Sequence, residues 1–340
     1  MEASQPVRRP FWTSLRGSVP PELAVSGTTL IVLILVLGLV APNFLAVTNF
    51  IDIARVVSII GIMAAGMTLV ILTGGIDLSV GSTFALGGAI TSALVVGSYS
   101  DSPNVGDFKL VVPLAVLAGL LVGAAIGFAN GWIITKTRIE PFMATLGTLI
   151  FVRGLVYLFT GGFPVLFRPP MDPGFAWIGQ GFIFGLPVPT VIFVAVVAVV
   201  WWVARRTTFG RSVYAIGGNE QAAWLSGIHV ARTKIFAYTT LGALAALSGI
   251  VLASRLAASS PTSGLTYELD VIAAVVIGGT SLAGGRGSVL GTVIGVFILG
   301  VVANALNLLG VSTDLQNISR GMLLVAAVGI DGYFRTRRRD

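Results

Sequence analysis

The sequence lacks cysteine and contains a single histidine, His229. Without cysteine, the chain can form neither a disulfide bond nor a thiolate metal site. His229 lies in a hydrophilic, basic segment, where we expect a solvated side chain and no metal ligand. A histidine acting as a base inside the apolar part of the chain is therefore excluded.

Sequence motifs of ATP-binding and hydrolytic enzymes are also missing. A phosphate-binding loop requires Gly-Lys followed by Ser or Thr, and none of the lysines, Lys109, Lys136 and Lys234, follows a glycine. Zinc-protease and Gly-x-Ser-x-Gly nucleophile patterns do not occur either. We therefore expect a chain that is not an enzyme and carries no cofactor of its own.

Charge is scarce, whereas apolar residues are abundant. Only 10% of the 340 residues are charged and 55% are apolar, against about 25% and about 45–50% in soluble domains. Apolar runs of about 20 residues span a bilayer. The runs long enough to do so lie at 23–41, 50–72, 78–96, 110–134, 142–160, 188–203, 235–258, 289–309 and 318–334.

A tenth apolar run, at 271–282, is too short to span without its polar flanks. Backbone groups in lipid must be hydrogen-bonded within the protein, so these runs predict helices, and the alternating strands of a barrel are absent. The sequence thus predicts an all-α, polytopic membrane helix bundle with about ten transmembrane segments. Residues 1–22 form a cytoplasmic tail, 23–334 a single transmembrane domain, and 335–340 a basic cytoplasmic tail. The run after the first tail lacks a cleavage-site pattern and predicts a retained helix.

Basic residues gather on one side of this topology. With the N-terminus cytoplasmic and ten crossings, the outer side takes only Lys109 and Arg168. Such asymmetry is typical of the positive-inside rule and places both termini in the cytoplasm. The net charge of +7 then requires only membrane lipid as a partner, and no nucleic acid. The cytoplasmic side takes Arg8, Arg9, Arg16, Lys136, Arg138, Arg205, Arg206, Arg211, Arg232, Lys234, Arg286, Arg335, Arg337, Arg338 and Arg339.

A few ionisable residues fall inside or beside the apolar runs. Arg153 and Arg320 are the most deeply placed cations, and we expect structural ion pairs or helix-end contacts for both in preference to substrate contact. Nearly all carboxylates of this group lie at predicted helix ends, which disfavours a proton-coupled carrier without excluding it.

A glycine-rich segment between two apolar runs has an echo 204 residues downstream. Gly74-Gly75-x-x-Leu-x-x-Gly81 aligns with Gly278-Gly279-x-x-Leu-x-x-Gly285. Paired glycine interruptions of this kind indicate broken helices on a transport path and an internal repeat. In the ten-crossing topology, both copies follow a segment that runs towards the cytoplasm, so the repeat is predicted to be parallel. An inverted repeat would require residues 271–282 to be re-entrant.

The hydrophilic segment 205–234 contains a predicted short helix. Gly217-Gly218-Asn219 predicts a turn, Asn219 a helix N-cap, and Gly227 the end of the helix. Docking on a cytosolic partner and simple interfacial packing both explain such a helix.

Several stretches resemble a known family. Glu220-x-Ala222-Ala223-x-x-x-Gly227 is similar to the coupling loop of ABC importer permeases, with one residue inserted after the glutamate. Residues 66–82, 140–155 and 267–285 resemble signatures of the monosaccharide permeases of bacterial ABC importers, and 304–312 leans towards the ribose type. The resemblance implies a multi-pass protein of the bacterial inner membrane. It also implies a second permease copy, a cytosolic ATPase with two nucleotide-binding modules that uses ATP and Mg, and a periplasmic sugar-binding protein.

A neutral sugar requires polar groups that bind it weakly enough for release. Candidates for the substrate pathway lie at the glycine-rich breaks and polar helix starts: Asp77, Ser79, Thr145, Glu268, Asp270, Thr280, Ser281, Asn304 and Asn307. An N-cap role for Asp77 explains it as well as a gating role. Asn304 and Asn307 share one helix face, where such pairs also hold helices together. The aromatic-rich outer loop at 163–189 suits either interfacial anchoring or docking of the binding protein.

The working hypothesis is ATP-driven uptake of a monosaccharide, most consistent with ribose or another pentose. Its rival is a secondary sugar carrier working without an ATPase, and a receptor or scaffold is a third alternative.

Overall fold

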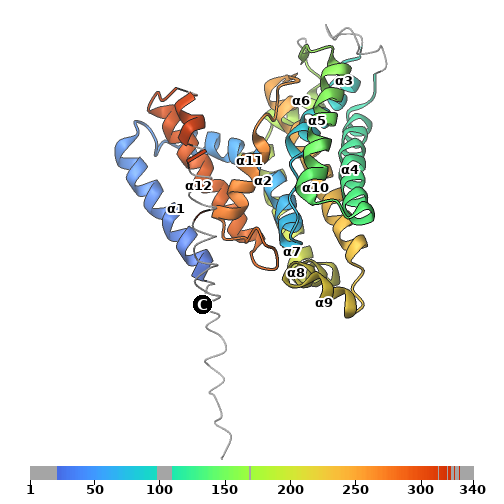
Figure 1. Ribbon diagram of the computed structural model, residues 1–340. Coiled ribbons are helices and arrows are strands. Elements are labelled where there is room, and N and C mark those ends of the chain that lie inside the picture. Colours follow the sequence, from blue (N-terminus) through green and yellow to red (C-terminus); the bar gives the residue numbers. More distant parts are fainter. Residues whose placement is uncertain are drawn as a thin grey trace, which may run out of the picture.

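The computed structural model describes residues 21–97, 109–167 and 170–312, together with 314–319, 321, 322, 325 and 329. The predicted tails at 1–22 and 335–340 lie almost entirely outside the described residues, as do Arg168 and Arg320. The helices are α1 (Pro21–Val40), α2 (Val47–Leu72), α3 (Val80–Val96), α4 (Val112–Thr137), α5 (Pro141–Thr160), α6 (Pro173–Gln180), α7 (Val188–Arg206), α8 (Thr208–Gly218), α9 (Glu220–Leu225), α10 (Val230–Leu256), α11 (Tyr267–Ile277) and α12 (Val289–Leu308) (Figure 1).

The helices follow the predicted apolar runs closely up to residue 309, whereas most of the predicted run at 318–334 lies outside the described residues. Among the described residues, seven helices are long and apolar enough to cross a membrane, namely α1, α2, α4, α5, α7, α10 and α12, and α3 is a shorter apolar helix. The chain is therefore a polytopic helical membrane protein, as its apolar runs predict. Strand structure in the described part is confined to two-residue pairs: β1 (Val165–Leu166) with β4 (Ala258–Ser259), and β2 (Phe182–Ile183) with β3 (Leu186–Pro187).

Two segments predicted as loops contain helices. The hydrophilic segment 205–234 holds α8, and Gly217 and Gly218 complete its last turn, so the predicted Gly-Gly-Asn turn is wrong. Buried Val213 and Ile216 explain α8, because they lie three residues apart on one helix face. The aromatic-rich segment 163–189 holds α6, whose N-cap Asp172 precedes Pro173 at the first helical position, a known start signal.

The core forms where α10 packs against α2, α3 and α4. Small residues let these backbones approach closely, as is common in membrane helix packing. A β-carbon on Gly127 of α4 would overlap the carbonyl oxygen of Tyr238 in α10, and one on Gly123 would overlap that of Gly242. Of the window of α2 that is apolar enough to span, 83% is buried inside the protein, so α2 is a central helix.

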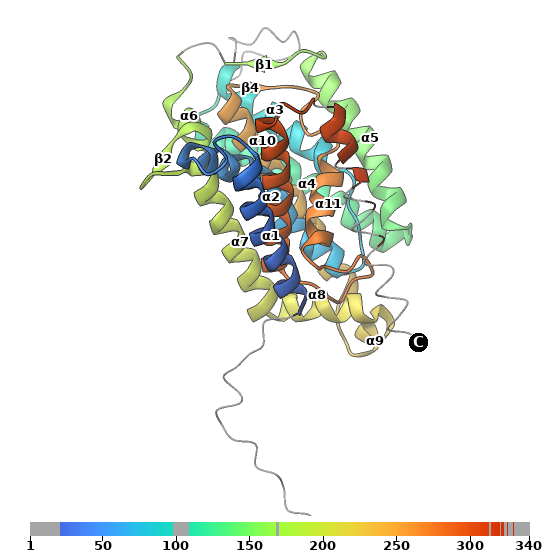
Figure 2. The same ribbon diagram turned by 90° about the vertical axis from the view of Figure 1, so that its left-hand side faces the viewer.

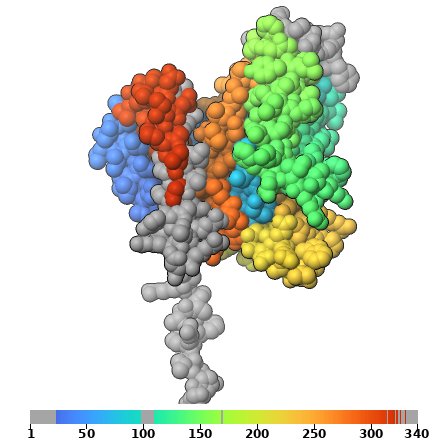
Figure 3. Space-filling model, viewed as in Figure 1, coloured from blue at the N-terminus to red at the C-terminus, as the bar shows by residue number. Residues whose placement is uncertain are grey.

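A second unit of the bundle is formed by α1 and α12. These helices pack against each other, and α12 also packs against α2 and α11. Viewed as space-filling, α1 and the red end of the described chain stand apart from α5, with a hollow between them at the top of the view (Figure 3). Most large side chains of α1 remain exposed, as expected of a helix that faces lipid.

The segment around α11 crosses only part of the membrane as a helix. α11 has 11 residues, about 16 Å at 1.5 Å per residue, against a hydrocarbon core of about 30 Å. It is preceded by non-helical chain in which Gly264 packs against Gly81 near the start of α3. A discontinuous helix of this kind is tolerated in a membrane only where protein or water covers its backbone.

Both α2 and α11 run antiparallel to α12. On α2, Thr68 contacts Thr292 while Val57 lies against Gly300. On α11, Ala274 lies against Gly295 and Gly278 against Gly291. α2 and α11 therefore run in the same direction, which agrees with a parallel arrangement of the two glycine-rich segments.

The carboxyl ends of α2 and α11 have the same backbone geometry. The sequence alignment of the two glycine-rich segments, however, pairs these ends one residue out of register. Gly74 has φ +80° and Gly279 φ +88°, the left-handed conformation that closes helices. The amide of Gly74 donates to Ile71 (2.8 Å), and that of Gly279 to Val276 (2.8 Å). Gly74 thus corresponds to Gly279, because the hydrogen bonds that end the helix set the register.

Candidate functional site

A buried polar network lies at the break between α2 and α3. The Asp77 side chain is only 2% exposed, and its Oδ1 accepts hydrogen bonds from the amide (2.8 Å) and hydroxyl (2.7 Å) of Ser79. Asn130 of α4 donates through Nδ2 to Ser79 Oγ (2.9 Å) and to Asp77 Oδ2 (3.3 Å). Its Oδ1 accepts from Thr148 of α5 (2.6 Å). The network therefore ties the break to two further helices.

Within this network the N-cap position of α3 belongs to Ser79, not to Asp77. Asp77 binds the amide of Ser79 from outside the helix, so it stabilises the turn before α3. Asn130 and Thr148 were not predicted as site residues. Asn130 had a signal, because an asparagine within the apolar run at 110–134 is expected to hydrogen-bond across helices.

Thr145 of α5 lies against the same break. Its side chain is fully buried, and its hydroxyl donates to the carbonyl of Pro141 (2.8 Å) and approaches that of Ile76 (3.3 Å). The hydroxyl of Tyr238 in α10 also donates to Ile76 (3.3 Å). The non-helical residues between α2 and α3 are therefore held by side chains from α4, α5 and α10.

Thr280 and Ser281 belong to the second break, between α11 and α12. Thr280 is buried, and its Oγ1 has no hydrogen-bond partner within the described part of the chain. The amide of Ser281 donates to the carbonyl of Arg286 (3.0 Å), which closes a turn. Beside this turn, the hydroxyl of Tyr214 in α8 donates to the carbonyl of Gly287 (3.0 Å).

Glu268 and Asp270 lie in the first turn of α11, where carboxylates suit the helix dipole. Glu268 approaches Gly81 at the start of α3. Arg153 of α5 donates to the carbonyls of Pro261 (2.8 Å) and Ser263 (2.9 Å) in the non-helical chain before α11. Arg153 therefore holds the non-helical chain before α11 through its backbone carbonyls, a structural contact other than the ion pair or helix-end contact expected for it.

Asp270 lies on the side of α11 that faces α2 and α12. It lines a small cavity of about 60 Å³ together with residues of α2 and α12. The pathway candidates therefore do not form one cluster.

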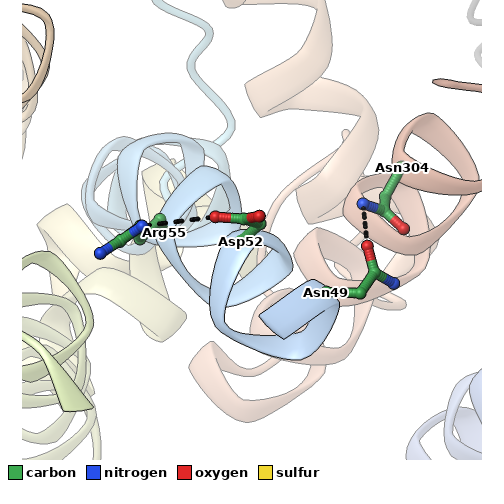
Figure 4. A network of polar contacts seen from close by, with 4 residues as sticks. All are labelled: Asn49, Asp52, Arg55 and Asn304. Carbon is green, nitrogen blue, oxygen red and sulfur yellow. Dashed lines mark hydrogen bonds and ion pairs between the residues drawn. The ribbon is translucent and has the colours of Figure 1, made fainter. Parts of the chain in front are cut away.

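Asn304 and Asn307 contact other segments of the chain. Asn304 of α12 donates to Asn49 Oδ1 of α2 (2.8 Å), and Asp52 pairs with Arg55 nearby at 3.4 Å (Figure 4). Asn307 Oδ1 accepts from Gln316 Nε2 (2.9 Å). Both contacts hold helical segments together.

The short helix predicted within residues 205–234 is present as α9. Asn219 caps it by accepting from the amide of Ala222 (2.9 Å), as predicted. Ala223 is buried, whereas Trp224 and Leu225 are 66% and 71% exposed. Glu220 pairs with Lys234 of α10 (2.7 Å). An open cavity of about 1160 Å³ lies between α9, the α4–α5 connection and the first break.

The two ends of the bundle differ in charge. The end formed by α8 and α9 (Figure 2) carries most of the basic side chains in the described chain. The opposite end carries α6 and the β2–β3 hairpin, on which Phe184 is fully exposed. Phe175 of α6 is buried and stacks on Phe167 at 4.9 Å, so part of the aromatic segment packs inwards.

No group of three or more His, Asp and Glu side chains that could hold a metal ion occurs within the described residues.

Comparison with known proteins gives matches along almost the whole chain. A family model described as the permease component of the branched-chain amino acid transport system matches residues 49–328. The ribose import permease protein RbsC of Haemophilus influenzae is 43% identical over 311 residues, 91% of this chain and 93% of that protein. RbsC of Bacillus subtilis is 44% identical over 302 residues, 89% of this chain and 90% of that protein.

The L-arabinose transport system permease protein AraH of Escherichia coli is 39% identical over 308 residues, 91% of this chain and 90% of that protein. No solved structure matches the chain. The family model covers most of the chain, and these relatives, all named as transport permeases, match it nearly end to end. The chain therefore belongs to this family of membrane permease components of transport systems.

Proposed function

We propose that the chain is the permease subunit of an ATP-driven importer and translocates a monosaccharide, with ribose as the first candidate. The observation that carries this proposal is the similarity to ribose import permeases over about nine tenths of both chains. The arabinose permease is less similar, at 39% identity, which favours ribose among pentoses. Membrane-spanning helices and a cytosolic-type coupling helix support the same function.

The energy source in this proposal is a separate cytosolic ATPase that binds α9. Trp224 and Leu225 project from a capped helix whose buried Ala223 anchors it to the protein. Exposed aromatic and aliphatic side chains on a short rigid helix suit insertion into a partner groove. ATP and Mg bind to the partner, consistent with the missing phosphate-binding loop.

The α8–α9 end faces the cytoplasm in this arrangement, because basic side chains favour that side. Both chain ends are then cytoplasmic. The α6 and β2–β3 end faces the periplasm, where exposed Phe184 offers an apolar contact for a sugar-binding protein. A second copy of the chain completes the pathway, as the resemblance to permeases of ABC importers implies.

Within the chain, the two breaks serve as the gate of the pathway. The helix-break glycines that bound them are Gly74, Gly75, Gly81, Gly278, Gly279 and Gly285. Asp77, Ser79 and Thr145 fix the first break in one conformation, and Thr280 and Ser281 lie in the second. Glu268 and Asp270, at the start of the half-length helix, remain candidates for weak sugar contacts, since half-helix ends bind polar ligands in other transporters.

Ribose uptake by purified protein in lipid vesicles tests the proposal. The full chain is reconstituted alone, or with the ATPase and the sugar-binding protein that co-purify with it, and uptake of labelled D-ribose is measured. We expect uptake only with both partners and ATP, unaffected by a protonophore. Uptake by the chain alone that a protonophore abolishes would establish a secondary carrier instead.

A further inference from the structure

Three segments far apart in the sequence meet at a junction of backbone atoms near α9. We name as the glycine junction the residues Gly74, Gly217, Gly284 and Gly285. The amide of Gly285 donates to the carbonyl of Leu72, the last residue of α2, at 3.0 Å. A β-carbon on Gly284 would lie 2.7 Å from the amide nitrogen of Gly74 and 3.0 Å from the α-carbon of Gly217. Both breaks therefore touch each other and the end of α8.

Gly217 is the centre of this junction. A β-carbon at this position would overlap the carbonyl oxygen of Leu72 and the amide nitrogen of Gly285. Both atoms belong to the hydrogen bond that joins the two breaks, so any side chain larger than hydrogen would separate them. The neighbouring Gly218 has open space around the same direction, with no atom within 4 Å. Of these two adjacent glycines in α8, only Gly217 therefore lacks room for a side chain.

A second contact joins α8 to the α11–α12 break. Tyr214, one turn before Gly218, donates its hydroxyl to the carbonyl of Gly287 (3.0 Å). Burial raises the pKa of Tyr214 above its ordinary value, against an opposing effect of Arg205, so the hydroxyl stays protonated and remains a donor. Gly287 has φ +141° and packs directly against buried Thr280. Tyr214 thus holds the same turn that contains Thr280.

α8 is a rigid connector between this junction and α9. Val213 and Ile216 are buried on one of its faces. α9 follows α8 directly (Figure 2), with only the extended residue Asn219 between the two helices. Because only one residue intervenes, a displacement of α9 moves the carboxyl end of α8. That end carries Gly217, which touches both breaks.

We propose that Gly217 and Tyr214 are positioning residues that transmit the movement of the partner-bound α9 to both breaks at once. The inference rests on the proposed function and adds which residues carry the coupling. Transmission through backbone contact is stiff, because no flexible side chain lies between Gly217 and the breaks. The competing explanation is static close packing, in which these residues only hold the fold together.

A pair of adjacent substitutions separates the two explanations. Gly217→Ala is compared with Gly218→Ala and wild type in the full complex with its co-purified ATPase and binding protein. The measurements are yield of assembled complex, unfolding midpoint, ATP hydrolysis and uptake of labelled D-ribose. We expect Gly217→Ala to assemble and hydrolyse ATP, while ribose transported per ATP falls by on the order of tenfold, within the range of energetic coupling between sites. Gly218→Ala should match wild type.

Two results would overturn the inference: unchanged ribose per ATP in Gly217→Ala, or a loss of uptake and hydrolysis strictly in proportion to the loss of folded complex. If wild-type complex itself shows no ATP-dependent ribose uptake, the proposed function fails first.

Tyr214→Phe provides a test that does not crowd the junction. It removes only the hydroxyl that binds Gly287, and Tyr157→Phe on the exposed face of α5 is the matched control. We expect Tyr214→Phe to lower ribose transported per ATP with the KM for ribose unchanged, and Tyr157→Phe to have no effect. A raised KM at an unchanged transport ratio would contradict transmission and indicate a substrate contact.

Discussion

Asp77 is a carboxylate enclosed by hydrogen-bond donors, and its role depends on whether its charge or its geometry is required. In the described chain it accepts bonds from Ser79 and Asn130 and takes part in no ion pair. A buried carboxylate in a carrier is a natural proton site. Its place before the first turn of α3 equally suits a structural acceptor.

Substitution of Asp77 distinguishes these roles. Asp77→Ala leaves the amide and the hydroxyl of Ser79 without their acceptor, at about 1–3 kcal/mol for each unsatisfied buried group. We expect a lowered unfolding midpoint and little ribose uptake. Asp77→Asn retains a carbonyl acceptor and should keep most of both. Loss of uptake in Asp77→Asn at an unchanged midpoint would instead indicate proton coupling.

We predict that the hydrogen bond between Asn49 and Asn304 stabilises the fold and has no role in transport. The 2.8 Å hydrogen bond joins α2 to α12, and such bonds between membrane helices average about 0.6 kcal/mol. A double-mutant cycle of Asn49→Ala and Asn304→Ala, followed by unfolding in detergent, should give a coupling energy of about that size. Ribose uptake should follow only the amount of folded protein, and a fall in uptake by Asn304→Ala alone would argue for a pathway role.

At the scale of elements, α9 depends on its cap. Asn219 is extended and binds the amide of Ala222, and loss of such a cap costs about 1 kcal/mol. We predict that Asn219→Ala weakens ATPase binding several-fold while the transmembrane helices unfold at the wild-type midpoint. Asn219→Asp, an equally good cap, is the control. Equal ATPase binding by both variants would show that α9 needs no fixed helical form.

Element boundaries were largely predictable, because runs of apolar residues determine membrane helices almost directly. α2, α3 and α12 begin and end within a few residues of their predicted runs. The cap of α9 was equally readable from Asn219, since capping is a local interaction. α8 was missed because its amphipathic pattern is short and three glycines, Gly210, Gly217 and Gly218, mask it.

Contacts between distant segments were not predictable in the same way. Asn304 was identified, but its partner Asn49 lies 255 residues away. The Asn130–Thr148 bond and the glycine junction likewise depend on how helices pack, which a single sequence does not specify. The glycine echo located both breaks, but only the hydrogen bonds show that Gly74 corresponds to Gly279.

At the scale of the whole molecule, sidedness makes a direct prediction. The chain contains no cysteine, so a single introduced thiol can be labelled without background. In intact cells with a permeabilised outer membrane, an impermeant maleimide should label Phe184→Cys and leave Leu225→Cys unlabelled until the inner membrane is opened. Both side chains are exposed, so accessibility differs only by side. The reverse labelling pattern would invert the proposed orientation.

The central claim joins the two ends of the molecule: a signal from the sugar-loaded binding protein at one end must reach the ATPase at the other. ATP hydrolysis by the reconstituted complex, with the co-purified binding protein added on the side opposite α9, tests this most directly. The account predicts that D-ribose with the binding protein raises hydrolysis several-fold and that ribose accumulates inside the compartment bearing α9. An ATP hydrolysis rate that does not change when ribose and the binding protein are added, together with ribose accumulation by the chain alone, would contradict it.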